Sequence, residues 1–187
     1  MARTRSLYLS GPTIHQPRAQ ALAAEARALC EAAGFTSLTQ TPELLTESEP
    51  SEAMAREIYA ERAARMRKAD AGVVDLTPFR GPHCDPAVAF EAGFLAGLGK
   101  PVFAYMNVLA EDDAELSSRV ADHIGAEQGD DGIWRDDDGS EIEDYGLPET
   151  LMLWAEARRL YVIVTPDIHR DLTGLQLCLD AVKLYLD

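Results

Sequence analysis

Residues 73–105 read VVDLTPFRGPHCDPAVAFEAGFLAGLGKPVFAY and contain a strand, a helix and a second strand in succession. The apolar run at 71–78 is typical of a strand buried on both faces of a parallel sheet. Residues 85–99 predict a helix, with Asp85 as its N-cap and Pro86 at its first position. Residues 100–107 predict the next strand. This stretch therefore indicates an α/β fold with a parallel sheet.

The same alternation of strands and helices continues on both sides of this stretch. The first predicted strand ends at Gly11-Pro12, and the first predicted helix is stopped by Gly34. We therefore expect one doubly wound, flavodoxin-like or Rossmann-like domain with a mostly parallel sheet over residues 1–187. The flanking elements are predicted as strands at 6–10 and 160–164 and as helices at 18–35, 52–70, 148–159 and 172–186.

Residues 110–144 differ from the rest of the chain because they are strongly acidic and rich in turn-forming residues. Within them, Asp138-Gly139 is flanked by Trp134 and Ile142, a pattern that permits a β-hairpin turning at Asp138-Gly139. We interpret the remainder of this region as turns.

The charge of the chain limits its partners. The 187 residues include 32 acidic and 17 basic side chains, which give a formal net charge of -15. Such a field repels phosphate backbones and anionic membrane surfaces, so we expect neither nucleic acid nor membrane as a partner. The apolar run near the N-terminus is too short for a signal peptide, and the three widely spaced cysteines indicate reduced thiols rather than a metal site. We expect a cytoplasmic protein.

Glu91 is the one anionic side chain in the otherwise uncharged run from Pro86 to Gly99. A carboxylate on an apolar helix face is costly to bury unless it is neutralised, paired or used. Asp85 precedes it by six residues, about one and two-thirds turns at ~3.6 residues per turn, so both can flank one pocket. Two carboxyl groups at a cleft suit glycosyl transfer, with Glu91 as nucleophile and Asp85 assisting the leaving group. The structural alternative is that Glu91 pairs with Arg80 or Lys100 and Asp85 is only a helix cap.

Three stretches carry a resemblance to a known family: LYLSGP (7–12), ADAGVVDLTPFRGPHCDPAVAFEAGFLAGLGKPVFAY (69–105) and IEDYGLPETLML (142–153). In this order the chain resembles the nucleoside 2-deoxyribosyltransferase family along nearly its whole length. The resemblance implies exchange of the base of a 2-deoxynucleoside, with retained configuration, through a covalent deoxyribosyl-glutamate, as in nucleotide salvage. It implies no cofactor and no metal. The implied partners are small-molecule deoxynucleosides, free bases and further copies of the chain, in a homo-oligomer built from dimers.

The resemblance also implies roles for individual residues. Glu91 matches the family nucleophile, and Asp85 matches the carboxylate that assists protonation of the base. Tyr8 matches a phenol near the catalytic glutamate; the alternative is a half-buried strand tyrosine with its tip in water. For Arg80 the alternative is a surface salt bridge. The substrate pocket is further implied to be shaped by Gly11, Pro12, Phe79, Arg80 and Gly81.

Three positions depart from the family pattern. His15 stands where relatives usually carry Phe; it can stack on a base or be an exposed loop histidine. Arg62 stands where they carry Asn or Asp, and it can instead lie on the polar helix face with Glu61. Thr150 stands where the family commonly has an asparagine that reaches into the neighbouring subunit's site and holds the sugar 5-hydroxyl. These departures concern the identity of the substrate.

Two other functions therefore stay open. One is hydrolysis of nucleosides or deoxynucleosides or their 5-monophosphates, with a phosphate site built from Arg18, Arg62 and Arg80. The net charge and the TPFRG loop favour a neutral nucleoside over this alternative. The other is a nucleoside-binding protein without turnover, against which the presence of both Asp85 and Glu91 argues.

Overall fold

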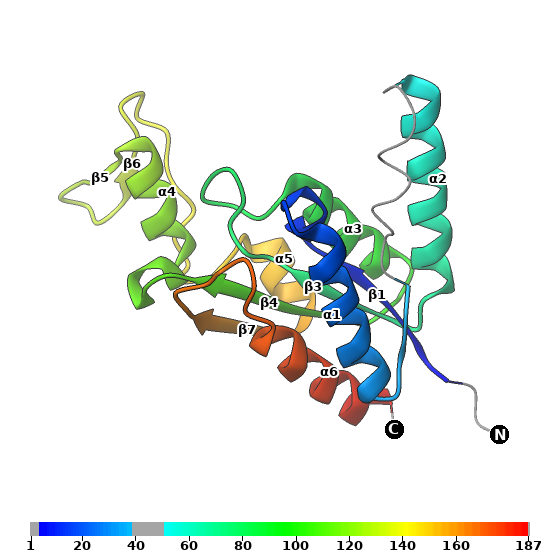
Figure 1. Cartoon of the computed structure of the whole chain (residues 1–187). Coiled ribbons are helices and arrows are strands. Elements are labelled where there is room, and N and C mark those ends of the chain that lie inside the picture. The colour runs from blue at the N-terminus through cyan, green and yellow to red at the C-terminus, as the bar shows by residue number, and fades with distance from the viewer. Residues whose placement is uncertain (1–3, 39–50, 187) are drawn as a thin grey trace.

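Five parallel strands run through the centre of the molecule in this computed structural model, which describes residues 4–38 and 51–186 (Figure 1). The strand order is β2-β1-β3-β4-β7, and every neighbouring pair is parallel. This is the flavodoxin-like doubly wound order, so the predicted fold class is confirmed. That one domain spans residues 1–187 stays a prediction. The strands are β1 Ser6–Ser10, β2 Thr36–Ser37, β3 Ala71–Asp75, β4 Val102–Val108 and β7 Ala157–Val164.

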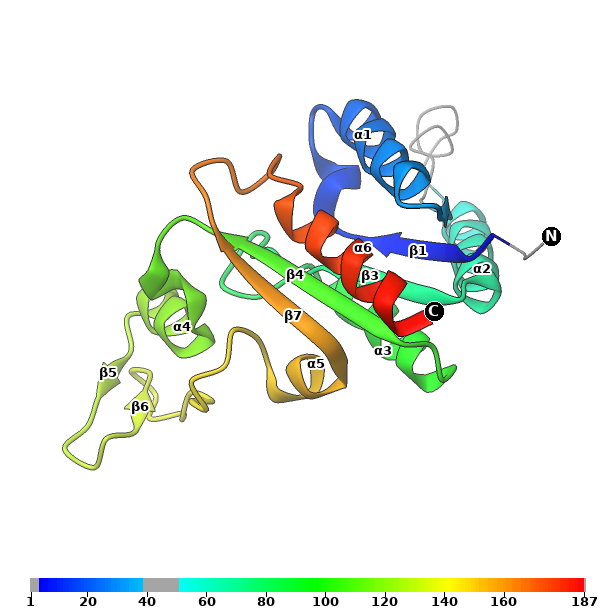
Figure 2. The ribbon, with the colours of Figure 1, turned by 90° about the horizontal axis from the view of Figure 1, so that it is seen from below.

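Helices cover both faces of the sheet (Figure 2). Because successive side chains of a strand point to opposite faces, each strand contributes to two separate cores. Tyr8 and Val74 pack on one face, and Leu7 and Val73 pack on the other. We call these the α3 face and the α6 face. The α3 face is covered by α2 Glu52–Lys68, α3 Pro86–Gly97 and α5 Leu151–Glu156, and the α6 face by α1 Ala19–Ala32 and α6 Thr173–Leu186.

The helix α3 begins as its sequence predicts. Asp85 Oδ1 accepts a hydrogen bond from the backbone N–H of Ala87 at 2.7 Å, and Pro86 occupies the first helical position. The helix ends before Gly99, which adopts a positive φ of 70°. Local capping signals therefore fix where the helix that carries Glu91 starts and stops.

The helix predicted at 148–159 is shorter in the structure. It begins at Leu151 and ends at Glu156, and β7 starts at Ala157 rather than at Leu160 as predicted. The reason is pairing across the sheet, since Ala157 lies opposite Val102 of β4 and the backbone is extended from there onward. Long-range hydrogen bonding overrides the helical pattern of these residues.

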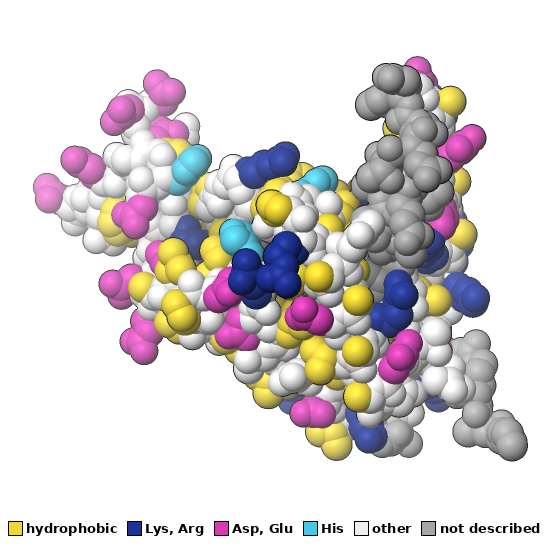
Figure 3. All heavy atoms as spheres, viewed as in Figure 1, with side chains coloured by type: hydrophobic (Ala, Val, Ile, Leu, Met, Phe, Trp, Pro, Cys, Tyr) yellow, Lys and Arg dark blue, Asp and Glu magenta, His cyan; other side chains and the backbone are white. Residues whose placement is uncertain are grey.

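The acidic region contains a helix that the sequence analysis missed. The structure has η1 Pro12–His15, η3 Glu111–Ala114 and α4 Leu116–Ile124, and α4 follows η3 directly. The apolar residues Leu116, Val120 and Ile124 recur every four positions, a helical signal hidden among charged neighbours. Acidic side chains gather on the projection that α4 forms with β5 and β6 (Figure 3).

The predicted hairpin turn at Asp138-Gly139 is present but it is one of two turns. Ile142 N–H donates to the carbonyl of Trp134 at 3.0 Å. Arg135 and Glu141 form an isolated antiparallel β-bridge. The two-stranded sheet itself pairs β6 Trp134–Arg135 with β5 Glu127–Gln128, which precedes β6 in the chain, and not with the segment that follows the Asp138-Gly139 turn. In the described residues, no helix has the length and apolar character needed to cross a bilayer.

Candidate active site

Glu91 of α3 is held at the carboxyl end of β1. Ser10 Oγ donates a hydrogen bond to Glu91 Oε2 at 2.5 Å, and Arg62 Nη1 lies 3.4 Å from Glu91 Oε1. The glutamate is only 5% exposed. A buried carboxylate beside a guanidinium and a hydroxyl donor is compensated in charge and in hydrogen bonding. The expected structural alternative, a pair with Arg80 or Lys100, is therefore replaced by a pair with Arg62.

Arg62 reaches Glu91 from the neighbouring helix α2. The alternative that it lies on the polar face of α2 with Glu61 is wrong, because Glu61 pairs with Arg65. Arg62 Nε is buried and has no hydrogen-bond partner within the described part of the chain. Among the described residues, the Nε donor of the guanidinium is therefore left unsatisfied beside the carboxylate.

Ser10 is a site residue that the sequence analysis missed. It lies two residues after Tyr8 on β1, so both side chains point to the α3 face. Tyr8 is fully buried, and the alternative of a tyrosine tip in water is wrong. The two-residue alternation of side chains along a strand is the signal that could have identified Ser10, because it places Ser10 on the same face as Tyr8.

Asp85 is buried and uses its two oxygens differently. Oδ1 caps α3 through Ala87 N–H, which confirms the capping role, while Oδ2 lies 3.7 Å from His15 Nε2. His15 in turn stacks on Phe79, with ring centroids 5.5 Å apart and an interplanar angle of 20°. His15 is therefore exposed, as one of its two alternatives expected, and it also packs on Phe79 beside the loop before α3.

The loop that leads into α3 surrounds a hollow. Arg80 Cζ lies 4.8 Å from the centroid of the Phe79 ring, so this arginine stacks rather than projecting freely. Arg80 has a φ of 57°, and Gly81 a φ of 156°, which bend the loop around the hollow. The hollow has a volume of ≈ 420 Å³, within the range of ~300–1,000 Å³ typical of small-molecule pockets. It is lined by Phe79, Arg80, Gly81, Pro82, His83, Cys84, Asp85, Pro86 and His123.

Close packing against Asp75 requires a glycine in the Gly11-Pro12 turn. A Cβ at Gly11 would lie 2.9 Å from the Cβ of Asp75, closer than side-chain carbons approach one another. Pro12 then starts the short helix η1, which carries His15. The turn thus lets the end of β1 pass close to the end of β3.

Thr150 lies apart from this loop. It precedes α5 and lines a groove of ≈ 400 Å³ between α3 and α5, together with Met152 and Leu153. The structure does not bring Thr150 into the hollow beside Asp85 within one chain.

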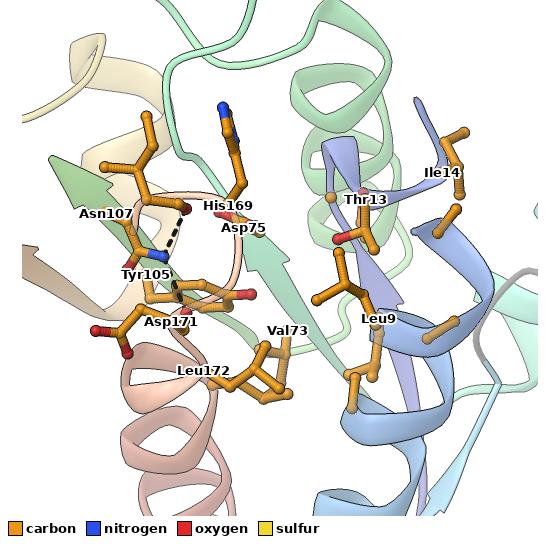
Figure 4. A pocket seen from close by; sticks show the side chains of 18 residues that line it. Leu9, Thr13, Ile14, Val73, Asp75, Tyr105, Asn107, His169, Asp171 and Leu172 are labelled. Atoms are coloured by element: carbon orange, nitrogen blue, oxygen red, sulfur yellow. Dashed lines mark hydrogen bonds between the residues drawn. The ribbon is translucent and has the colours of Figure 1, made fainter. Parts of the chain in front are cut away.

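A second group of polar residues lies on the opposite, α6 face of the sheet (Figure 4). Asp75 hydrogen-bonds the hydroxyl of Thr77 at 2.5 Å and also that of Tyr105. Burial raises the pKa of Asp75, and these hydrogen bonds oppose the rise only in part. The adjoining cavity measures ≈ 60 Å³, far below the ~300 Å³ at the lower end of ligand pockets. It is therefore not the substrate pocket in this conformation.

Asn107 closes this cavity from β4. Its amide donates to the carbonyls of Ile168 and Asp171 at 2.9 and 3.0 Å, as Figure 4 shows. These bonds tie the loop before α6 to the sheet. In the described residues, no cluster of three or more His, Cys, Asp or Glu side chains is arranged to hold a metal ion.

An α/β fold of flavodoxin-like order, with a buried glutamate at the strand ends and an aspartate at the start of its helix, defines a class of small-molecule enzymes and binding proteins. The family model described as nucleoside 2-deoxyribosyltransferase matches residues 7–152. The chain therefore belongs to the nucleoside 2-deoxyribosyltransferase family.

Individual relatives are distant. The chain is 25% identical to a 2-desoxiribosyltransferase from Leishmania mexicana, with a TM-score of 0.54 over 80% of this chain and 85% of that one. A conserved protein from Enterococcus faecalis shares the fold, with a TM-score of 0.51, 16% identity and coverage of 96% and 99%. An uncharacterized protein of Schizosaccharomyces pombe is 30% identical over 102 residues, 53% of this chain. The match spans 48% of that fungal relative's length.

Proposed function

We propose that the protein transfers the 2-deoxyribosyl group between nucleobases, with Glu91 as the nucleophile. The observation that carries this proposal is the placement of Glu91, buried at the end of β1 between Ser10 and Arg62. Ser10 and Arg62 hold the carboxylate of Glu91 in one orientation, which favours its attack on a carbon centre. Membership of the family supports the same reaction.

The reaction takes place in two displacements. In the first, a carboxylate oxygen of Glu91 bonds to the anomeric carbon while the bond from that carbon to the base nitrogen breaks. The base leaves with the electron pair and receives a proton through Asp85. In the second, a nitrogen of an incoming base attacks the same carbon, releases Glu91 and gives up its proton through Asp85. Two inversions leave the configuration at the anomeric carbon unchanged.

The hollow beside Asp85 suits the base rather than the sugar. Phe79 and Arg80 line the hollow and stack on each other, and His15 stacks on Phe79. Planar groups of this kind bind a flat heterocycle. Tyr8 is buried on the same face as Glu91, where we infer that it helps to orient the carboxylate. A sugar without a 2-hydroxyl reaches the oxocarbenium-like transition state more easily, which supports a deoxyribosyl substrate.

Hydrolysis of a nucleoside 5-monophosphate is the second candidate function. Arg62 favours it, since its guanidinium is half-buried beside Glu91 and keeps Nε without a partner in the described residues. Arginine binds phosphate through two parallel N–H donors, and a phosphate bound to this guanidinium would satisfy the buried Nε group. The net charge of -15 favours a neutral nucleoside instead.

We further propose that the enzyme is a homo-oligomer in which Thr150 approaches the site of a neighbouring subunit. None of the α5 residues is buried in the chain, and Met152 is 75% and Trp154 46% exposed. A six-residue helix with this composition gains from contact with another protein surface. The cytoplasmic location and a role in nucleotide salvage stay predictions.

The decisive experiment is incubation with deoxyinosine or thymidine, with and without adenine, followed by chromatography of the bases and nucleosides. Transfer predicts that deoxyadenosine forms only when adenine is present. Base release that is independent of adenine identifies a hydrolase, and deoxynucleoside 5-monophosphates tested in parallel show whether phosphate is preferred. A protein that binds these compounds without releasing base would contradict both enzymatic functions.

A further inference from the structure

A buried arginine joins three segments of the chain at the side of the Asp85 hollow. Arg119 of α4 is 8% exposed. Its Nε donates to the carbonyl of Pro82 at 2.8 Å, Nη1 to that of Asp113 at 2.7 Å and Nη2 to that of Pro148 at 2.7 Å. One side chain thus links the loop before α3, the short helix η3 and the segment before α5.

A buried glutamate makes the complementary contacts. Glu149 is fully buried, and its Oε2 accepts the backbone N–H of Cys84 at 3.1 Å. Its Oε1 accepts the backbone N–H of Thr150 at 2.9 Å and lies 3.3 Å from His83 Nδ1. Arg119 therefore binds carbonyl oxygens of the same segments whose N–H groups Glu149 binds.

The two charges compensate each other in a buried environment. Burial lowers the pKa of Arg119, and the negative charges of Glu149 and Asp113 act against this. Ionised side chains are costly to bury, and removing one of two such partners leaves the other uncompensated. The contacts of Arg119 and Glu149 do not belong to the packing of the sheet or of the helices. They are made to backbone atoms of the connecting segments.

We propose that Arg119 and Glu149 are positioning residues that fix the loop 82–84 and thereby set the place of Asp85. The inference rests on the proposed function of Asp85 in assisting departure of the base. Asp85 follows Cys84 directly, and the loop between Phe79 and Asp85 forms the wall of the hollow. Clamping Pro82 by its carbonyl and Cys84 by its N–H leaves this wall little freedom to move.

The same pair holds the residues on both sides of the Pro148–Thr150 segment. Arg119 binds the carbonyl of Pro148, and Glu149 binds the N–H of Thr150. The clamp therefore fixes the start of α5 against the Asp85 loop, so that displacement of one segment is transmitted to the other. The clamp therefore connects the hollow of one subunit to the segment that, in our proposal, approaches the site of the neighbouring subunit.

The chain carries its own reporter for the clamp. The thiol of Cys84 is 5% exposed, and burial raises its pKa to about 12, so it reacts with thiol reagents only when the loop opens. Cys30 and Cys178 are buried in the α6-face core and report general unfolding instead. Labelling each cysteine with a maleimide and quantifying the peptides by mass spectrometry separates the two events.

The test uses the full chain with Glu149→Gln and Arg119→Lys. Glutamine keeps the size but loses one acceptor, and lysine keeps the charge but cannot span three carbonyls. We expect labelling of Cys84 to accelerate about tenfold, the effect of one hydrogen bond worth about 1.4 kcal/mol, while Cys30 and Cys178 keep their rates. The matched control is Arg135→Lys on the partly exposed strand β6, which should leave all three rates unchanged.

The kinetic part of the test separates positioning from stability. Both variants should lower kcat more for poor leaving bases than for good ones, as loss of Asp85 itself should, with little change in KM. An unchanged Cys84 rate in both variants overturns the clamp, and equal slowing for all bases overturns its role in positioning Asp85. Should Glu149→Gln expose all three cysteines together, Arg119→Lys, which keeps the buried positive charge, decides by the same criteria. If wild-type protein releases no base while Cys84 accelerates in the variants, the proposed function fails and the clamp stands.

Discussion

Glu91 and Asp75 are both carboxyl groups near the carboxyl end of β1, and they lie on opposite faces of the sheet. Glu91 on the α3 face contacts a cation, Arg62, and a hydroxyl donor, Ser10. Asp75 on the α6 face hydrogen-bonds two neutral hydroxyls, and burial raises its pKa. The β1 turn separates them, with Ser10 bonded to one and Gly11 packed against the other.

The difference teaches that the partners, more than burial itself, decide what a buried carboxyl does. Arg62 and Ser10 hold the two oxygens of Glu91 in a defined orientation, which suits nucleophilic attack. The hydroxyl groups around Asp75 satisfy its hydrogen-bonding capacity without requiring a buried negative charge. This suits a structural role between β3 and β4. The following predictions test this contrast, beginning with the largest expected effect.

Replacing Glu91 with Ala should reduce base release and base exchange by ~10⁴-fold or more, because the nucleophile is lost. Rates are measured by chromatography with deoxyinosine as donor and adenine as acceptor. Glu61→Ala, which removes a glutamate from the surface of α2, is the control and should retain activity. Appreciable turnover in the Glu91 variant would falsify the covalent mechanism.

Replacing Arg62 with Met should lower the free energy of unfolding by about 3 kcal/mol, because the buried carboxylate of Glu91 loses its cation. Urea unfolding measures this change. Adding Glu91→Gln to the same chain should restore much of the stability, since the uncompensated charge is then gone. If the double variant is as unstable as the sum of the two single variants, the pair is not coupled.

Replacing Asp85 with Asn should slow departure of poor leaving bases by ~10²-fold and of good leaving bases much less. Asparagine keeps an oxygen that can cap α3, so the fold is retained. The measurement is kcat for a series of deoxynucleosides whose bases differ in acidity. Uniform slowing across the series would mark Asp85 as a helix cap alone.

Replacing Asp75 with Asn should change how stability depends on pH. Since the folded state raises the pKa of Asp75 above its unfolded value of 3.8, this carboxyl stabilises the fold at acid pH and loses that contribution as pH rises through its folded pKa. The Asn variant lacks this titration, so its melting temperature should gain on that of wild type as the pH rises above 3.8. Parallel melting curves at every pH would show that Asp75 ionises equally easily in both states.

Replacing Thr150 with Asn should lower KM for deoxynucleosides by about threefold to tenfold, because an amide reaches further than the threonine hydroxyl toward the sugar. Steady-state kinetics with the purified oligomer measure the effect. A site adapted to a 5-phosphate should gain nothing from the amide. Sedimentation of a fully active monomer would contradict the shared site.

The sequence predicted the elements whose signals are local. Asp85 and Pro86 cap α3 in the structure as their identities indicate, and β3 and β4 follow their apolar runs. The boundary between α5 and β7 was misplaced, because residues from Ala157 onward are held by β4, far away in the sequence. Local propensity cannot report such pairing.

The candidate site was predicted in its residues but not in its contacts. Glu91 and Asp85 were identified by their isolation on an apolar helix, whereas Ser10 and Arg62 meet Glu91 across 81 and 29 residues of sequence. Arg62 was predicted as a departure from relatives, as a residue of the polar helix face or as part of a phosphate site, and not as the partner of Glu91. The sequence analysis did not recognise Arg119 and Glu149 as site residues. Charged residues are expected to be exposed when only the sequence is known, whereas both of these are buried.

The position of β7 at the edge of the sheet has a consequence for self-association. An edge strand of eight residues offers backbone groups to which a strand of another molecule can add. Arg158 and Arg159 stand near the start of this strand and are both exposed, and charged side chains on an edge discourage such addition. The chain thus protects its open sheet edge from amyloid-like stacking at the same strand that completes its fold.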